Sequence, residues 1–337
     1  MNLWKISLLL LVYLLAGCAE QQPSSQISTD LPQTAEIEQF IPTPAATQPA
    51  STANTFEASR QEIPSIITQT PPVTPTLLAA SSPVPTLSPV GWQDLPVLPE
   101  IDPSMKDVYR LGLVLGNNPR AFSKVGDCGS TPAWFLGDFD RNPKYYNLGE
   151  YTYLEPVIQE FQGSYERTSL AAKAGFNAAS VFSLIWSNRE QCQPDETPLA
   201  CEYRIQRPSF AFIMLGSNDV WHQNSFETQM RQIIEYSLQH GVIPILSTKA
   251  DNLEKDGSIN TTIARLAQEY RVPLINYWRA VQSLPDQGLQ DDAVHITWGP
   301  NRFNDPEVMQ AGWPVRNLTS LQALDAAWRA VMDNNQE

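Results

Sequence analysis

The sequence has few positive charges and few histidines. Its 337 residues contain 22 Lys and Arg against 36 Asp and Glu, with three His, for a formal net charge of −14. No basic stripe offsets this charge, so the chain is not expected to bind a nucleic-acid backbone. The same charge disfavours broad adhesion to anionic membrane surfaces.

Several sequence motifs are also missing. The chain contains no phosphate-binding loop, no dinucleotide fingerprint and no zinc-spaced set of His and Cys. We therefore expect neither a cofactor nor a metal ion. No repeat with a period of 20–50 residues is visible, which argues against a solenoid.

The first 18 residues, "MNLWKISLLLLVYLLAGC", are typical of a bacterial signal sequence, with one Lys, a short apolar run and small residues before Cys18. The apolar run is shorter than the roughly 20 residues of a membrane-spanning helix. "LLAGC" also resembles the lipobox of bacterial lipoproteins, which implies that Cys18 is lipidated and becomes the mature N-terminus. An ordinary secreted protein is the alternative. We expect an extracytoplasmic protein, lipid-anchored to the bacterial cell membrane.

Composition divides the rest of the chain into two parts. Residues 19–95 are rich in Pro, Ser, Thr and Gln and have little hydrophobic periodicity. Such a segment buries too little apolar surface to offset the entropy of ordering, so it is predicted to be a disordered tether. Residues 96–337 are predicted to form one folded domain, expected to be a monomer.

Three cysteines remain once Cys18 is assigned to lipidation. Cys192 and Cys201 lie in the Pro- and acid-rich loop "EQCQPDETPLACEY". A disulfide that closes this loop is our preferred pairing, and the chain-entropy formula gives it about 2.7 kcal/mol. With this pairing, Cys128 is the odd cysteine of the chain. An odd cysteine in an exported protein calls for an explanation.

Short apolar runs alternate with helical patterns through the second half of the chain. This alternation predicts β-α-β units and a three-layer α/β/α sandwich with a mostly parallel, flavodoxin-like sheet. One helix is expected to start at Ser225 and to end before Gly241, and another to start near Asn317 or Thr319. The expected strands are 121–126, the start of 209–219, 242–248 and 272–278, and the expected helices are 225–241, 260–271 and 317–332.

Polar residues follow three of the expected strands. They are Gly126-Asp127-Cys128, then residues 216–219, and finally "DDAVHIT" at 291–297, expected in the loop after strand 272–278. Ligand sites of open α/β sheets form beyond the carboxyl ends of the strands. The sequence therefore predicts a site where these three loops meet.

The motifs in these loops resemble those of the SGNH, or GDSL, hydrolases, which are esterases and lipases on an α/β/α fold. The usual Gly-Asp-Ser block corresponds to "GDCGS", with Cys128 in place of the nucleophilic serine. Gly175 in "AAKAGFNAAS" is a weak match to the block that supplies a glycine. The Gly-x-Asn-Asp block matches residues 216–219, and the Asp-x-x-His block matches residues 292–295.

The resemblance implies roles for these residues. Cys128 would be the nucleophile, His295 the base and Asp292 the group that orients it. The oxyanion hole would consist of the Asn218 amide and the backbone N–H groups of Gly175 and Cys128.

The neighbouring polar residues have simpler interpretations. The Asp beside the oxyanion-hole Asn is structural in the family, so Asp219 is expected to be structural, and we interpret Asp127 in the same way. His240 precedes Gly241 at a helix end and is expected to act in capping. His222 lacks the upstream Asp and is expected at most to line the pocket.

Cysteine in place of serine leaves two functions open. A thiol beside an imidazole can ionise and attack an ester, as cysteine hydrolases do. Alternatively, the domain is catalytically silent and binds carbohydrate or a cell-envelope polymer. Ser130 is a further conceivable nucleophile, but a shift of two residues along a turn should point it elsewhere.

Three tryptophans flank the predicted site loops. Trp134, Trp221 and Trp298 could form a stacking surface for sugar rings or an acyl group, although Trp is often core. The substrate we expect is a carboxylic ester, with acylated polysaccharide as the favoured class.

Overall fold

The computed structural model describes residues 91–332. Residues 1–90, which hold Cys18 and most of the expected tether, and residues 333–337 lie outside this range, so the lipobox and tether remain predictions. Among the helices of residues 91–332, none combines the length and apolar character needed to cross a membrane.

The centre of the domain is a parallel sheet. Its strands are β1 (Asn118–Gly126), β3 (Pro208–Met214), β4 (Ile243–Ser247) and β5 (Leu274–Ile275), which lie in the order β1-β3-β4-β5. A single parallel bridge between Gly126 and Ala172 adds a partner to the other edge of β1. After β1 the chain therefore pairs first on one side of that strand, at Ala172, and then on the other side, as β3, so the order of the sheet reverses between β1 and β3.

A second, two-stranded parallel sheet lies outside this layer. It pairs β2 (Tyr146–Asn147) with β6 (Asn301–Arg302).

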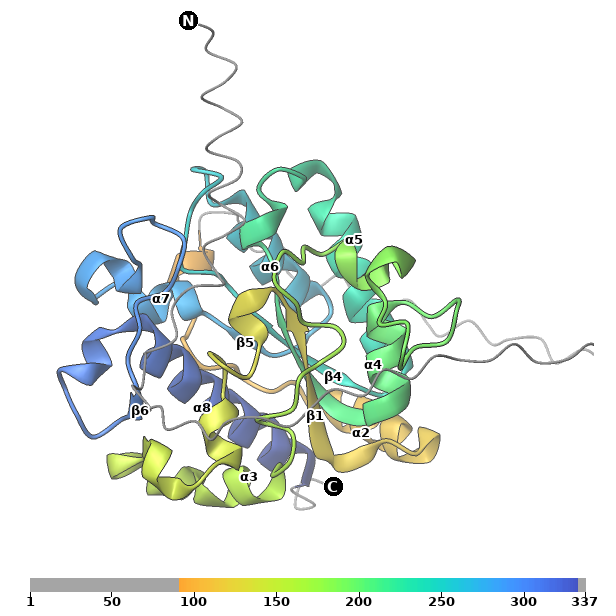
Figure 1. Ribbon diagram of the computed structural model, residues 1–337, viewed down its shortest axis with the longest axis horizontal. Helices are drawn as coiled ribbons and strands as arrows, with labels where there is room; N and C mark the ends of the chain where they lie inside the picture. The colour runs from red at the N-terminus through yellow and green to blue at the C-terminus, as the bar shows by residue number, and fades with distance from the viewer. Residues whose placement is uncertain (1–90, 333–337) are drawn as a thin grey trace, which may run out of the picture. The chain divides into compact units, whose positions relative to one another are not determined.

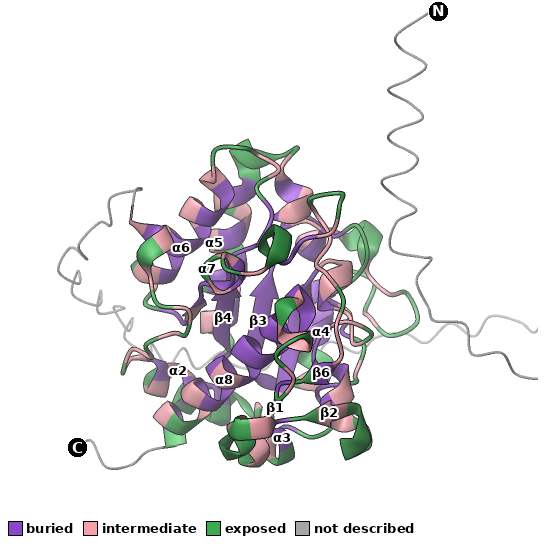
Figure 2. Cartoon of the chain, turned by 90° about the vertical axis from the view of Figure 1, so that its left-hand side faces the viewer, coloured by how far each residue is buried: buried purple, intermediate pink, exposed green. Residues whose placement is uncertain are grey.

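Helices cover both faces of the main sheet, as the sequence predicts (Figure 1). On one face lie α2 (Met105–Leu115), α3 (Glu155–Glu160) and α8 (Gly312–Met332). On the other face lie α4 (Pro198–Gln206), α5 (Gln223–Gln239) and α6 (Ser258–Glu269), while the short α7 (Tyr277–Val281) follows β5. Figure 2 shows that the central strands and the inner sides of these helices are buried.

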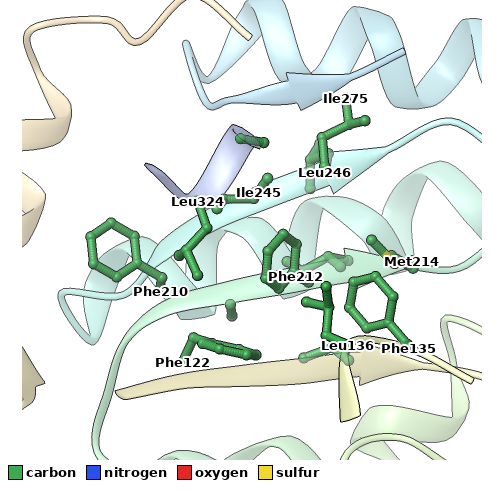
Figure 3. Packing of buried hydrophobic residues seen from close by; sticks show 14 of the residues in the cluster. Phe122, Phe135, Leu136, Phe210, Phe212, Met214, Ile245, Leu246, Ile275 and Leu324 are labelled. Carbon is green, nitrogen blue, oxygen red and sulfur yellow. The ribbon is translucent and has the colours of Figure 1, made fainter. Parts of the chain in front are cut away.

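Aromatic packing positions the segment that follows β1. Every residue of β3 is buried, because helices cover both of its faces. Phe212 of β3 meets Phe122 of β1 and Phe135 edge-on, with ring centroids 5.5 and 5.3 Å apart (Figure 3). Phe135 is therefore fixed against the sheet only seven residues after Cys128.

Two helix starts differ from the prediction. Helix α5 begins at Gln223 rather than Ser225, whose hydroxyl donates to the carbonyl of His222 instead of capping. Its end is as expected, since the helix stops at Gln239, His240 is the C-cap residue and Gly241 follows with φ +64°.

Helix α8 begins at Gly312, five residues before Asn317 and seven before Thr319, the two expected caps. Asn317 is buried and braces loops instead: its Oδ1 accepts from the N–H of Leu136, and its Nδ2 donates to the carbonyl of Trp134.

The expected strand 272–278 is largely wrong. Only Leu274–Ile275 pairs with β4, and a helix starts at Tyr277. The reason is Asn276, which caps α7 by accepting from the N–H of Arg279 at 3.2 Å.

Asn276 also holds the start of the described chain. Its Nδ2 donates to the carbonyl of Trp92 at 3.0 Å and to that of Leu95 at 3.1 Å, and its backbone N–H donates to Val97. The Trp92 ring is buried and meets Trp278 edge-on. The packed region therefore starts before residue 96, because residues 91–95, predicted as tether, belong to it.

The predicted disulfide is confirmed. Cys192 and Cys201 are bonded, with Cα atoms 5.3 Å apart, and the bond ties the loop before α4 to that helix. Cys128 forms no disulfide.

A lysine side chain lies inside the core. Lys124 of β1 is fully buried, and its Nζ donates to the carbonyls of Tyr165 and Phe135 at 2.5 and 3.3 Å. Burial lowers its pKa to about 7. In the unfolded chain the same amine titrates near its ordinary value of 10.5.

We predict that Lys124 makes stability rise with pH above about 7. Between pH 7 and 9 the unfolded chain holds a proton on this amine that the folded protein lacks. Relative to Lys124→Met, the wild-type free energy of unfolding should increase by up to about 2.7 kcal/mol across these two pH units. Urea unfolding at pH 7 and pH 9 measures these free energies, and Lys144→Met, at an exposed lysine, is the control. Parallel pH dependences in wild type and Lys124→Met would contradict the prediction.

Candidate active site

The Gly-Asp-Cys turn leaves the end of β1 sharply. A Cβ on Gly126 would lie 2.1 Å from Ser130 Oγ and 2.5 Å from the Met214 carbonyl oxygen, so only glycine fits. Asp127 Oδ1 accepts from the N–H of Gly129 at 2.9 Å, in the structural role expected for it. Together these contacts place the half-buried Cys128 at the point where the sheet order reverses.

Ser130 cannot replace Cys128 as the reacting group in this conformation. Its side chain is only 1% exposed, and its hydroxyl lies beneath Gly126.

The Gly216–Asp219 loop follows β3 and lies beside the segment that contains Gly175. Asn218 Nδ2 donates to the carbonyl of Phe176 at 2.9 Å, and Asp219 Oδ1 accepts from the N–H of Ala178 at 2.9 Å. Asn218 has a second amide N–H, which remains available to a ligand. The structure therefore joins two of the four motif blocks directly.

Asp219 is buried in this loop. Burial and the nearby Asp127 carboxylate raise its pKa to about 6, although the N–H groups of Ala178 and Gly216 favour its charged form. Because Asp127 contributes to this shift, the carboxylates of the two motif blocks lie close enough to interact electrostatically.

A buried ionic network under this loop could not be predicted from the motifs. Ser217 donates to Asp251 Oδ2 at 2.5 Å. Lys249 Nζ in turn donates to Asp251 Oδ1 and to Glu254 Oε2, both at 2.6 Å. The network ties the loop after β3 to the loop after β4.

Gly175 is exposed and has φ +82°, and a Cβ there would meet nothing within 4 Å. Its backbone N–H as an oxyanion donor therefore stays a prediction.

Asp292 and His295 form the expected pair. Asp292 Oδ2 lies 2.5 Å from His295 Nδ1, and Asp292 Oδ1 accepts from the backbone N–H groups of Val294 and His295. Burial alone would raise the pKa of Asp292, but these hydrogen bonds lower it below its ordinary value. The carboxylate thus fixes the imidazole and leaves its Nε2 to face outward from the pair.

The sequence suggests that loop 291–297 directly follows the last strand, but in the structure it does not. Helix α7 and a turn at Pro285–Gly288 come between them. The loop is held instead by the first residues of α8: Gly312 N–H donates to Thr297 Oγ1 at 2.8 Å, and Trp313 N–H to the Thr297 carbonyl at 3.1 Å.

The same helix start meets the Gly-Asp-Cys turn. A Cβ on Gly129 would lie 3.0 Å from Arg316 Nη1 and 3.5 Å from Trp313 Cη2. The first turn of α8 therefore connects the His295 loop to the Cys128 turn. Sequence reasoning missed both residues, although Trp and Arg three positions apart share one side of a helix.

The three predicted tryptophans differ in exposure. Trp221 and Trp298 are 79% and 66% exposed. Trp134 is partly buried and stacks on Trp313, with centroids 5.7 Å apart. The Trp134 ring therefore packs against the domain beside the turn and is less accessible to a ligand than Trp221 and Trp298.

The other two histidines lie at the ends of α5. His240 Nδ1 lies 2.7 Å from the Tyr236 carbonyl oxygen, as a capping role requires. His222 precedes the helix and lies near enough to Asp219 to favour its charged form.

Within the described residues, one cluster has the ligand types for a metal, formed by Cys192, Glu196 and Cys201. Both of its sulfurs are in the disulfide, and Glu196 pairs with Arg204 at 2.6 Å. This cluster is therefore not a metal site.

We predict that Gly216→Ala destabilises the protein. The residue has φ +135°, and its Cβ would lie 2.9 Å from Ile259 Cγ2, so the loop under Asn218 must shift. Strain of this kind costs about 1–3 kcal/mol. Gly163→Ala is the control, because φ there is +94° but no atom lies within 4 Å of the Cβ. Thermal unfolding measures the stability of both variants. An equal loss of stability in Gly216→Ala and Gly163→Ala would rule out the steric contribution.

No family model and no curated protein matches this chain. Among solved structures, the chain is similar to the acetylxylan esterase Axe2 of Geobacillus stearothermophilus, at 16% identity and a TM-score of 0.37. That match covers 62% of this chain and 95% of the other. A GDSL-like lipase of Bacteroides thetaiotaomicron has 14% identity and a TM-score of 0.38, over 66% and 98% of the two chains. These TM-scores lie below 0.5, so the likeness carries no conclusion about the function of this chain.

Proposed function

We propose that this protein hydrolyses carboxylic esters, with Cys128 as nucleophile, His295 as general base and Asp292 as its orienting partner. The observation that carries the proposal is the Asp292–His295 pair, in which the carboxylate accepts from two backbone N–H groups and contacts Nδ1. Support also comes from the Gly126–Cys128 turn, which lies where the sheet order reverses.

In the first half of the proposed reaction, His295 Nε2 takes the thiol proton. The Cys128 sulfur then attacks the carbonyl carbon, forming a C–S bond while the carbonyl π electrons move to oxygen. Collapse of this intermediate breaks the C–O bond, and the alkoxide leaves with the proton from His295. The product is an alcohol and a thioester on Cys128.

The second half uses water. His295 takes one proton from a water molecule, whose oxygen attacks the thioester carbon. The C–S bond breaks, the sulfur regains its proton from His295, and the carboxylic acid departs. Asp292 stays ionised throughout because it stabilises the imidazolium.

The oxyanion would be held by the second N–H of the Asn218 amide and by the backbone N–H groups of Cys128 and Gly175. Losing one such donor typically raises the barrier by about 2.7–4 kcal/mol. The bond from Asn218 to Phe176 fixes the amide plane before substrate binds.

A second function is a silent domain that binds carbohydrate or a cell-envelope polymer. Cysteine at the position of the usual serine is the observation that favours it. The bonded Asp292–His295 pair favours the enzyme, because a binding domain has no evident need for a general base.

As substrate we propose an acylated polysaccharide outside the cytoplasm. The exposed indoles of Trp221 and Trp298 flank two of the motif loops and suit stacking against sugar rings. The lipobox at Cys18 supports attachment of the chain to the bacterial cell membrane.

Hydrolysis of a short-chain nitrophenyl ester by the full chain tests the proposal, with Cys128→Ala and Cys128→Ser beside the wild type. The wild type should turn over, and Cys128→Ala should lose essentially all turnover because no nucleophile remains. Cys128→Ser should retain or gain activity.

The silent alternative predicts a different pattern. The wild type and Cys128→Ala would both be inactive, and activity would appear only in Cys128→Ser. Turnover unchanged in Cys128→Ala would contradict Cys128 as nucleophile.

The substrate class has its own test. Trp221→Ala and Trp298→Ala should each raise KM for an acetylated oligosaccharide about three- to tenfold, since a stacking contact contributes about 0.5–1.5 kcal/mol. Neither should change KM for the nitrophenyl ester more than twofold. Tyr145→Ala, an exposed aromatic before β2, serves as control. Equal KM values for the oligosaccharide in wild type and both variants would count against the sugar surface.

A further inference from the structure

Arg316 is a buried cation for which the described residues offer no carboxylate within ion-pair distance. Its side chain is 8% exposed, and its hydrogen bond goes from Nη2 to the sulfur of Met214 at 2.9 Å. Nε is buried and donates to no atom of the described chain. A guanidinium stays charged in proteins, and among the groups around it the Asp127 carboxylate favours this buried charge most.

The aromatic rings around Arg316 explain part of this burial. The guanidinium carbon lies 5.1 Å from the Trp313 ring centroid, 5.3 Å from that of Phe135 and 5.9 Å from that of Tyr277. Ring faces attract a cation but do not neutralise it.

The charge is directed at the Cys128 turn. Nη1 fits into the space that a side chain at position 129 would fill, 3.0 Å from the Cβ position of Gly129. Burial lowers the pKa of Arg316, whereas Asp127, Tyr277 and Cys128 favour its charged form. The guanidinium in turn favours the ionised form of each of these groups, of Asp127 most and also of the Cys128 thiol.

We propose that Arg316 is a positioning residue that holds Cys128 as a thiolate in the resting protein. This inference deepens the proposed function and takes from it only that Cys128 is the nucleophile.

The chemistry of the nucleophile explains why a cation is useful here. A serine hydroxyl is far too weak an acid for a neighbouring guanidinium to ionise at neutral pH, so a serine enzyme gains no resting alkoxide from it. A thiol has an ordinary pKa of about 8.5, which a nearby cation can bring to about 3.5–7.5. The transfer of the thiol proton to His295, which is the first step of the proposed reaction, has then already taken place before substrate binds, and the proton later passes to the leaving alkoxide.

Other charged groups act on the same sulfur. The carboxylate of the adjacent Asp127 opposes a thiolate, and Asp219, whose carboxylate interacts with that of Asp127, adds negative charge to the same edge of the sheet. Tyr277 would oppose a thiolate only when ionised. Protonated His295 would favour it. Because Asp219 has a pKa of about 6, its opposition weakens below that pH.

The test is the pH dependence of Cys128 alkylation in the full chain. Iodoacetamide labelling is followed from pH 4 to 10 by the mass of the tryptic peptide 125–141, which separates Cys128 from the other cysteines. The wild-type rate should have its midpoint at or below about 7.5. Arg316→Met should move the midpoint towards about 8.5 and lower the rate at pH 6 at least tenfold, while Arg316→Lys should lie between them.

Gly129→Ala covers the case in which Arg316→Met does not fold, because a Cβ there should displace Nη1 and raise the midpoint in the same direction. Near-UV circular dichroism checks the fold of each variant. An equal midpoint in wild type and Arg316→Met overturns the proposal. A wild-type midpoint at 8.5 or above does so without any variant.

His295→Gln separates this proposal from the proposed function. A midpoint that moves in His295→Gln but not in Arg316→Met means that the imidazolium holds the thiolate, and the role of Arg316 fails while ester hydrolysis stands. A midpoint that moves in Arg316→Met, in a protein that hydrolyses no ester, leaves the role of Arg316 intact and overturns the hydrolase.

Discussion

Parallel pairing of β1 with β3 is the constraint on which the site depends. The register sets Gly126 opposite Met214, so both strands end at the same level of the sheet. The two chains leave that edge side by side, one through Asp127 and Cys128 and the other through Gly216 and Asn218. Because the sheet order reverses there, no crossover helix covers the gap between them.

The sequence predicts this part of the molecule well, for physical reasons. Strands buried on both faces appear as apolar runs, and β3 and β4 are such runs, so the polar groups at their ends could be located. The Asp292–His295 pair is local, since three residues separate them and one turn suffices to join them. The Cys192–Cys201 bond likewise spans a short loop.

The remaining features depend on contacts between distant segments. Nothing near position 276 indicates that an asparagine would end β5 by binding the chain around Trp92. The Thr297–Gly312 contact, which places the His295 loop, joins segments that no local pattern connects. Arg316 occurs in a helix without an obvious polar face, and only tertiary packing reveals that it lies beside the Cys128 turn.

The attachment of residues 92–97 to Asn276 has a mechanical consequence. The chain enters the domain through carbonyl groups that one side chain and one backbone N–H hold in place, beside the Trp92–Trp278 contact. Tension applied to the chain ahead of residue 91 would load these bonds first, at the β5 edge of the sheet. The strands β1 and β3, which carry the site, are separated from that load by β4 and β5. A force on the N-terminal side of the domain therefore acts at the β5 edge of the sheet, whereas Cys128 lies at the β1 edge.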